Sequence, residues 1–282
     1  MSDDVARYYD RNTRRFLLMG GARGVHSIHR ELWGAEVRSA HEAADHINRL
    51  LADEIAGLDI GPEPSIVDFG CGVGGTLFHL AQRMPKARLL GITISRRQVE
   101  IAERFVEKLG HADACSFSLG DFHTADTGVR ADVVLAVESF AHSHSAEAFL
   151  ANAVRNLGPE GRLIVVDDFL ASEKESLATR QRRRVEQFQA GWRVPAICTE
   201  EHLVHSAAQH GLRTEKTVDL TSLTRPGSRV RDRLTAIVSP LLARLGLSRI
   251  PFCGNLIGGN ALQIGLRDGF LRYRFLVFRK QA

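Results

Sequence analysis

The sequence predicts an α/β fold built on a doubly wound, largely parallel sheet, and three observations carry this prediction. Short apolar runs typical of buried strands alternate with segments whose apolar residues recur at helical spacing. A glycine-rich loop, VDFGCGVGG at 67–75, lies between the first such strand and the next helix. Two regions, residues 1–35 and 221–260, lie outside the alternation. Strands separated by helices favour a parallel sheet, and we expect both outlying regions to cover its ligand-binding edge.

The first expected helix spans 36–56, where Val37, Ala44, Ile47 and Leu51 share one face. The elements expected after it, in chain order, are a strand at 65–70, a helix at 75–84, a strand at 87–94, a helix at 95–110, strands at 114–121 and 132–137, a helix at 145–157, a turn at 158–161, a strand at 162–168, a helix at 199–211, and a helix followed by an edge strand over 258–280.

Composition narrows the class of protein. The chain has 282 residues, 44% of them hydrophobic and 25% charged, which is ordinary for a globular protein. No apolar run approaches the roughly 20 residues of a membrane span, and the first residues show no secretory signal. The four cysteines have no metal-ligand spacing, which is typical of reduced thiols in a cytoplasmic protein. The net charge of +4 suits an anionic small molecule better than nucleic acid, because the arginines do not alternate with aromatic residues.

The glycine loop predicts a ligand at a helix N-terminus, where backbone N–H groups can approach it closely. The spacing Gly70-x-Gly72-x-x-Gly75 also fits a dinucleotide fingerprint, so an NAD-dependent oxidoreductase is one alternative. That fingerprint is followed about 20 residues later by an acid for the ribose. Here the corresponding strand ends in GITIS, which carries no acid.

Several motifs together resemble class I S-adenosylmethionine (SAM)-dependent methyltransferases. VDFGCGVGGT resembles their motif I, and GITIS followed by Gln98 resembles the subgroup of cyclopropane fatty acid synthases and tocopherol, sarcosine and prenyl diphosphate (geranyl diphosphate) methyltransferases. The other matching segments are LGDF at 119–122, NLGPEGRLIVVDD at 156–168, YYD at 8–10 and IHRELWG at 28–34. The resemblance implies a seven-stranded Rossmann-like sheet with a final antiparallel strand and a helical cap. It also implies a helical segment over 1–60 that closes over the cofactor, and a core over 61–282 with cap insertions at about 170–195 and 221–260.

The resemblance also implies a set of cofactor contacts. The loop backbone would follow the methionine moiety with Asp68 as its anchor, Gln98 would take the ribose, and Asp121 would accept from the adenine amine. The implied SAM-binding residues are Tyr9, Trp33, Asp68, Gly70, Cys71, Gly72, Gly74, Thr93, Ile94, Ser95, Gln98, Gly120, Asp121, Phe122, Val137 and His142. The implied acceptor-binding residues are Tyr8, His29, Glu138 and Trp192.

Glu138 is the candidate catalytic residue, because a carboxylate at the end of the apolar run VVLAV needs a reason to be there. VES resembles the NES of geranyl diphosphate C-methyltransferases, whose glutamate is proposed to stabilise a cation and take a proton. The cyclopropane synthases resemble GMFEHVG, and their glutamate aligns with Ala141, which argues against cyclopropanation. The alternative is a structural role for Glu138, as a hydrogen-bond acceptor for the N-terminal segment or the SAM amino group.

We therefore expect SAM-dependent methylation of a small hydrophobic metabolite, with C-methylation of an isoprenoid or related natural product preferred over O- or N-methylation. A catalytically silent SAM-binding module is a further alternative. No metal site is expected, since His142 and His144 lack a third ligand, and Mg²⁺ enters only if the acceptor carries a diphosphate near Asp167 and Asp168. The apolar stretch within 221–260 fits either a lid or the interface of a homo-oligomer.

Overall fold

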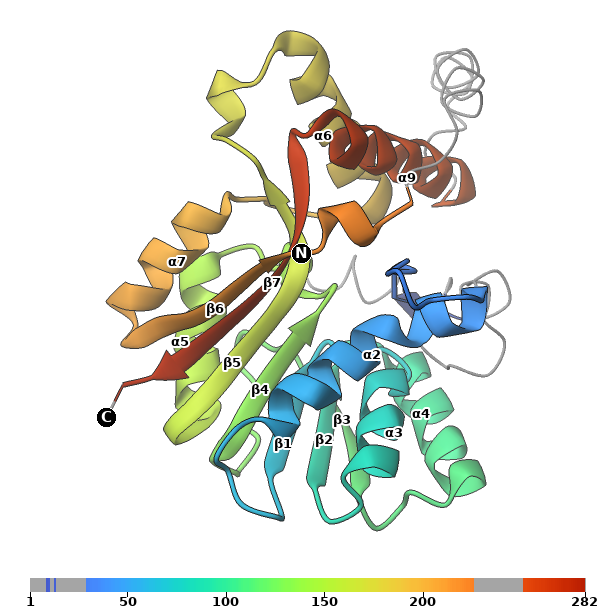
Figure 1. Ribbon diagram of the computed structural model, residues 1–282, viewed down its shortest axis with the longest axis vertical. Helices are drawn as coiled ribbons and strands as arrows, with labels where there is room; N and C mark the ends of the chain where they lie inside the picture. Colours follow the sequence, from blue (N-terminus) through green and yellow to red (C-terminus); the bar gives the residue numbers. More distant parts are fainter. Residues whose placement is uncertain (1–8, 11–12, 14–28, 226–250, 282) are drawn as a thin grey trace.

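The computed structural model describes residues 9–10, 13, 29–225 and 251–281. Within these residues the chain forms one seven-stranded sheet with the order β3-β2-β1-β4-β5-β7-β6 (Figure 1). The strands are β1 (Ser65–Phe69), β2 (Arg88–Thr93), β3 (Cys115–Leu119), β4 (Ala131–Val137), β5 (Leu157–Leu170), β6 (Leu212–Asp219) and β7 (Leu271–Lys280). The predicted doubly wound sheet is confirmed, because β1, β2, β3, β4 and β5 pair in parallel.

The prediction that the last strand forms the edge of the sheet is wrong. β7 pairs antiparallel with both β5 and β6, so it lies inside the sheet, and β6 is the edge. The inserted strand is apolar where it crosses the core, with Tyr273, Leu276 and Phe278 fully buried. β6 itself escaped prediction, because its sequence LRTEKTVD is polar and largely exposed and gives little apolar signal.

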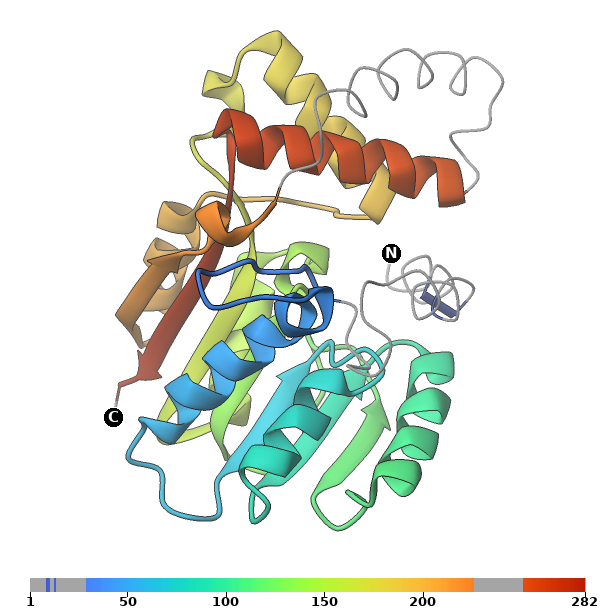
Figure 2. The same cartoon turned by 45° about the vertical axis from the view of Figure 1, so that its right-hand side comes forward.

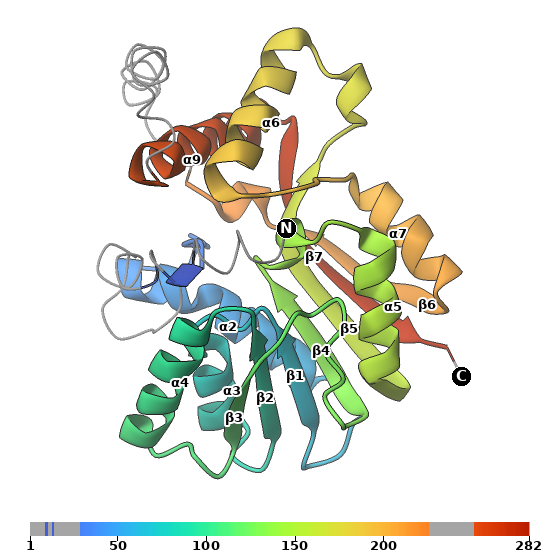
Figure 3. The same ribbon diagram turned by 180° about the vertical axis from the view of Figure 1, so that it is seen from behind.

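Helices cover both faces of the sheet (Figure 3). α2 (Ala40–Ala56), α3 (Gly75–Arg83) and α4 (Arg96–Leu109) pack on one face, and α5 (Ala146–Asn156) and α7 (Glu200–Gln209) pack on the other. Side-chain caps fix several helix starts: the hydroxyl groups of Ser39, Ser95, Ser145 and Thr199 each accept from a backbone N–H three residues on. The cap at Ser39 explains why the first of these helices begins at residue 40 rather than 36.

The turn expected at 158–161 lies within β5. The pairing with β4 jumps from Ala131↔Leu157 to Val133↔Arg162, so the extra residues form an irregularity in the strand. Glu160 takes a left-handed conformation there, with φ at 60°. GPEG therefore bends the chain without ending the strand.

Two long helices form a cap beyond the carboxyl ends of the strands (Figure 2). α6 (Thr179–Trp192) and α9 (Pro251–Asp268) cross where glycines meet. A Cβ atom on Gly191 would lie 2.4 Å from the Gly254 carbonyl oxygen and 2.8 Å from the Gly258 Cα atom. The two backbones therefore touch at this crossing, with no space for a side chain between them. Short 3₁₀ turns at Phe140–His142, Lys174–Ser176 and Thr221–Leu223 complete the described elements.

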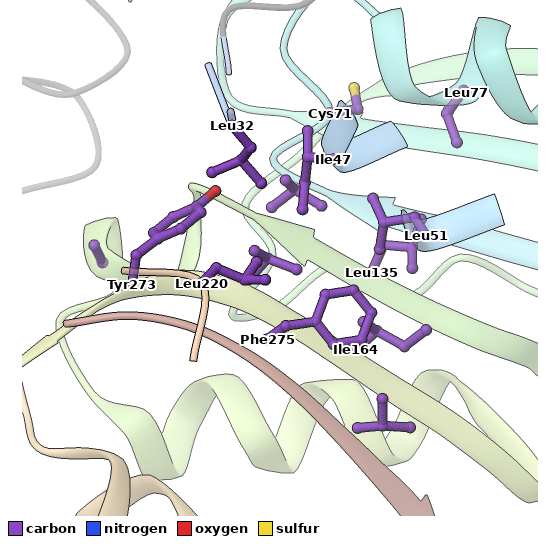
Figure 4. Packing of buried hydrophobic residues seen from close by; sticks show 14 of the residues in the cluster. Leu32, Ile47, Leu51, Cys71, Leu77, Leu135, Ile164, Leu220, Tyr273 and Phe275 are labelled. Atoms are coloured by element: carbon purple, nitrogen blue, oxygen red, sulfur yellow. The ribbon is translucent and has the colours of Figure 1, made fainter. Parts of the chain in front are cut away.

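The N-terminal segment meets the chain that follows β6. The Trp33 N–H donates to the Leu223 carbonyl oxygen at 2.7 Å, and Leu32 forms an isolated bridge with Thr224. Leu32 is fully buried and packs in the same core cluster as Ile47 of α2 (Figure 4). These contacts place residues 29–33 at the carboxyl edge of the sheet. None of the helices described here combines the length and the apolar character that crossing a membrane requires.

Candidate active site

A cavity of about 440 Å³ opens at the carboxyl ends of β1 and β4. The strand order reverses between these two strands, which is where ligands bind in open α/β sheets. Its lining comes from the glycine loop, the ends of β2, β4 and β5, the segment at 29–30, and the two cap helices.

The glycine loop turns sharply after β1. The N–H groups of Gly70 and Cys71 both donate to the Ile92 carbonyl oxygen, at 2.8 and 3.0 Å, which ties the loop to β2. Gly70, Gly72 and Gly74 have φ angles of 82°, 57° and 90°, a region that glycine reaches at little cost. A Cβ on Gly70 would lie 2.4 Å from the Ser139 Cβ, and one on Gly74 would lie 2.6 Å from the Phe117 ring.

Gly72 differs from these two, because a Cβ there would meet nothing within 4 Å. Gly72 lines the cavity, so its backbone is open to a ligand from that side. Gly70 and Gly74 are glycines because neighbouring side chains occupy the space. Gly72 leaves a cradle that a bound molecule can fill.

The end of β2 is fixed by buried hydrogen bonds. The Thr93 hydroxyl donates to the Gln98 Oε1 atom at 2.6 Å, and Ser95 caps α4 while donating to Asp10 Oδ1 at 2.5 Å. Thr93 and Gln98 are both 4% exposed and line the cavity. The Gln98 amide is therefore held in one orientation beside the cavity wall.

Tyr9 and His142 meet at another part of the wall. The His142 Nδ1 atom lies 3.3 Å from the Arg193 carbonyl oxygen, which can only accept, so Nδ1 carries the proton of the neutral ring. Nε2 then accepts from the Tyr9 hydroxyl at 2.7 Å. Burial lowers the pKa of His142, which keeps the ring neutral.

Glu138 lies directly after β4 in a left-handed conformation, with φ at 50°. Its N–H donates to the Val166 carbonyl oxygen at 2.8 Å. Its Oε1 atom accepts two hydrogen bonds, from the Arg30 N–H at 3.0 Å and from the Tyr273 hydroxyl at 2.8 Å. Figure 4 shows that hydroxyl pointing toward the end of β4. The carboxylate is thus held between the N-terminal segment and β7.

Arg30 and two aspartates complete a buried charged cluster. The Arg30 guanidinium donates to both carboxylate oxygens of Asp168, at 2.8 and 2.7 Å, and lies 4.3 Å from the centre of the Tyr273 ring. Asp167 accepts from the N–H groups of Ala141 and Asp168. Burial, together with the charge on Asp168, raises the pKa of Asp167 to about 8.

The sequence model of the methyltransferase domain family matches residues 54–211, more than half of the chain. That range contains the glycine loop, GITIS, LGDF and Glu138. The chain belongs to the SAM-dependent methyltransferases. This membership excludes the oxidoreductase that the glycine spacing alone left open.

Relatives of the methyltransferase act on different atoms. It is 27% identical to an O-methyltransferase of Pyrenophora dematioidea over 235 residues, which covers 82% of this chain and 83% of the relative. It is 25% identical to norajmaline N-methyltransferase of Rauvolfia serpentina over 187 residues, which covers 63% and 64%. Among solved structures, one of geranyl diphosphate C-methyltransferase of Streptomyces coelicolor superposes with a TM-score of 0.74 at 18% identity. The match covers 99% of this chain and 97% of that one. That structure is a complex with Mg²⁺, geranyl-S-thiolodiphosphate and S-adenosyl-L-homocysteine (SAH).

The methyltransferase brings most of the predicted site residues together. The predicted SAM-binding residues that line the cavity are Tyr9, Gly70, Cys71, Gly72, Thr93, Ile94, Gln98, Phe122, Val137 and His142. Of the predicted acceptor-binding residues, His29, Glu138 and Trp192 line it as well. Tyr8 falls outside the described residues.

The other predicted residues are not among those that line the cavity. Gly74 and Ser95 begin α3 and α4, and Gly120 follows β3. Trp33 packs under the Arg225 guanidinium, which lies 3.8 Å from the centre of its ring. Burial within β1 raises the pKa of Asp68 to about 7. Asp121 binds His123, with 2.7 Å between Oδ1 and the ring Nδ1.

Sequence reasoning missed two residues of the charged cluster, Arg30 and Tyr273. Tyr273 is the residue paired with Asp168 across β5 and β7, so only the register of the sheet brings it to the site. Its neighbours Arg272 and Arg274 are charged, so the local sequence gives Tyr273 no apolar context that would have marked it. No group of three or more His, Cys, Asp or Glu side chains in the described part of the chain is arranged to hold a metal ion.

Proposed function

We propose that this methyltransferase C-methylates a small acceptor of isoprenoid type, and that Glu138 stabilises the positive charge that forms on the acceptor. The observation that carries the proposal is the strained, oriented carboxylate at the end of β4. A non-glycine residue in the left-handed region costs about 1–3 kcal/mol, and such strain is found mostly at functional sites. Tyr273 and Arg30 hold Oε1, and no described residue donates to Oε2.

The cofactor half of the cavity fits SAM, because the open face of Gly72 provides the space that a bound cofactor needs. We propose that the backbone of the glycine loop holds the methionine part, and that Thr93, Gln98 and Phe122 hold the ribose and adenine. SAM supplies, when bound, an electrophilic methyl group on a sulfonium centre. The chain's own contribution is to position the acceptor and to place a negative charge where positive charge develops.

The other half of the cavity fits an apolar acceptor without a phosphate. Phe188, Trp192, Val194 and Leu262 contribute apolar surface to it. Among the described lining residues Arg30 is the one permanent cation, and Asp168 already neutralises it. A diphosphate is recognised by unpaired arginines or by a metal ion. We therefore propose a neutral isoprenoid acceptor, with no requirement for Mg²⁺.

O-methylation is the second candidate, because the match to an O-methyltransferase extends over 82% of this chain and 83% of that relative. Geraniol separates the two candidates, since it offers both an alkene carbon and a hydroxyl to the same enzyme. Methyl-labelled SAM, geraniol and geranyl diphosphate are incubated with the enzyme, with and without excess EDTA. We expect label on carbon, activity on geraniol, and no effect of EDTA. Label on oxygen would support O-methylation, and activity on the diphosphate alone that EDTA abolishes would support the metal-dependent form.

Glu138→Gln tests the role of the carboxylate. The amide keeps the shape and the hydrogen bonds from Tyr273 and Arg30 but removes the charge. We expect turnover to fall by about 10²- to 10⁴-fold, as when a catalytic acid or base is lost, while calorimetry finds unchanged SAH affinity. Glu100→Gln on the exposed side of α4 serves as the matched control. Near-normal turnover of Glu138→Gln would leave the residue with a structural role, and weakened SAH binding would make it a cofactor ligand.

A further inference from the structure

We infer that His29 is the base that takes the proton from the methylated acceptor, with its ring held in one tautomer by Thr76. This inference rests on the proposed function and divides the chemistry between two residues. Glu138 stabilises the charge, and His29 removes the proton. Both residues line the same cavity.

A chain of buried hydrogen bonds decides which ring nitrogen of His29 carries the proton. The Thr76 hydroxyl donates its single proton to the Asn48 Oδ1 atom at 3.0 Å. The Asn48 amide is oriented in turn, because its Nδ2 donates to Asp45 at 3.0 Å. The Thr76 oxygen can then only accept from His29 Nε2, which lies 2.7 Å away. Thr76 and Asn48 are 2% and 0% exposed, so water does not compete for these bonds.

Within the described residues, nothing occupies the remaining ring nitrogen of His29. With Nε2 protonated, the neutral ring carries its lone pair on Nδ1, and no described residue hydrogen-bonds to that atom. Burial lowers the pKa of His29, and the negative charge of Glu138 opposes this effect without cancelling it. The ring therefore enters the reaction neutral and ready to accept.

We assign Glu138 the role of a fixed negative charge, because the two donors on its Oε1 atom hold the carboxylate in place. The negative charge of Glu138 stabilises the positive charge that forms on the acceptor. It also offers a counter-ion to a protonated His29, whereas Arg30 is neutralised by Asp168 and adds little repulsion. Glu138 thus acts as a fixed negative charge, and His29 acts as the proton acceptor.

The balance of the reaction is complete without another reagent. The bond from the methyl group to sulfur breaks as a bond to an alkene carbon forms, which leaves SAH and a positive charge on the neighbouring carbon. A C–H bond beside that carbon then breaks, its electron pair forms a new double bond, and the proton goes to His29 Nδ1. The imidazolium releases the proton to solvent when the product leaves.

The first test needs no acceptor. The ¹⁵N chemical shifts of histidine-labelled protein report the tautomer and the titration of each ring, and His29→Asn identifies the signal. With SAH bound, we expect the Nε2–H tautomer and a midpoint below the ordinary value of about 6.5. Thr76→Val removes the acceptor at Nε2 and should give mixed tautomers. The Nδ1–H tautomer, or a ring that is protonated at pH 7, would overturn the inference.

The second test follows the fate of the cation with geraniol and labelled SAM. In His29→Asn we expect SAH release to continue, while the alkene product falls by about 10²-fold or more and water-captured, methylated alcohol takes its place. Glu138→Gln instead lowers SAH release itself. Unchanged alkene yield in His29→Asn would refute the role of His29 alone, whereas label on oxygen in the wild-type enzyme would refute the proposed function.

Discussion

Gly72 and Gly110 share a left-handed backbone conformation but lie in different parts of the fold. Both have positive φ angles, 57° and 73°, and a Cβ on either would meet nothing within 4 Å. Gly72 faces the cavity, whereas Gly110 ends α4 on the outside of the fold. The pair separates the cost of backbone strain from the cost of filling the cavity.

Gly72→Val should abolish SAM binding while leaving the protein folded, because the new side chain projects into the space proposed for the methionine part. Gly110→Val carries a similar strain, about 1–2 kcal/mol, and should bind SAM normally. Calorimetry gives the affinities and thermal unfolding gives the two stabilities. Normal SAM binding by Gly72→Val would place the cofactor away from this loop.

The sequence could place a single residue at the cavity where the signal lies in its immediate sequence neighbours. The glycines and Glu138 carry their signal in neighbouring letters, such as a strand that ends in a turn or in a charge. Arg30 and Tyr273 do not, because they reach Glu138 from positions 108 and 135 residues away. Their role depends on which strands become neighbours, and the alternation of apolar residues says nothing about that.

Helix positions followed from the sequence more closely than strand positions. Ser and Thr caps and apolar spacing act within one segment, so α2, α4, α5 and α7 begin close to where these signals lie. The sheet order is a property of the whole chain. β7 therefore appeared as an edge strand although it is inserted between β5 and β6, and β6 was missed.

α6 and α9 touch through their backbones, and both helices contribute residues to the cavity wall. Gly191→Ala inserts a methyl group where the Gly254 oxygen would be 2.4 Å away, so the helices must separate. Overpacking of this kind costs about 1–3 kcal/mol. We expect lower thermal stability, a shifted emission of Trp192, and weaker geraniol binding with unchanged SAH affinity.

Gly57→Ala is the control for this change. Its Cβ would lie at ordinary contact distances of 3.4 and 3.6 Å at the end of α2, outside the cap. This variant should keep the wild-type emission and affinities. Equal geraniol binding by Gly191→Ala and the wild type would mean that the position of the two cap helices does not affect acceptor binding.

At the scale of the molecule, the cofactor half should make the whole fold more stable when it is filled. A ligand at 100 times its dissociation constant adds about 2.7 kcal/mol, which is roughly 5–10 °C in melting temperature for a domain of this size. We expect this shift with SAH and none with NAD, measured by calorimetric scanning at matched concentrations. A shift with NAD and none with SAH would contradict the assignment of the cavity.

The position of β7 has a consequence for how the enzyme is made. A ribosome releases β5 more than a hundred residues before β7, so the nascent sheet carries an unpaired edge at β5 during that interval. Asp168 and Glu138 lie beside that edge without the Tyr273 ring and hydroxyl that later hold them. Until β7 enters the gap beside β5, Glu138 lacks one of the two donors that hold its Oε1 atom, so we expect no methyl transfer from a chain truncated before β7.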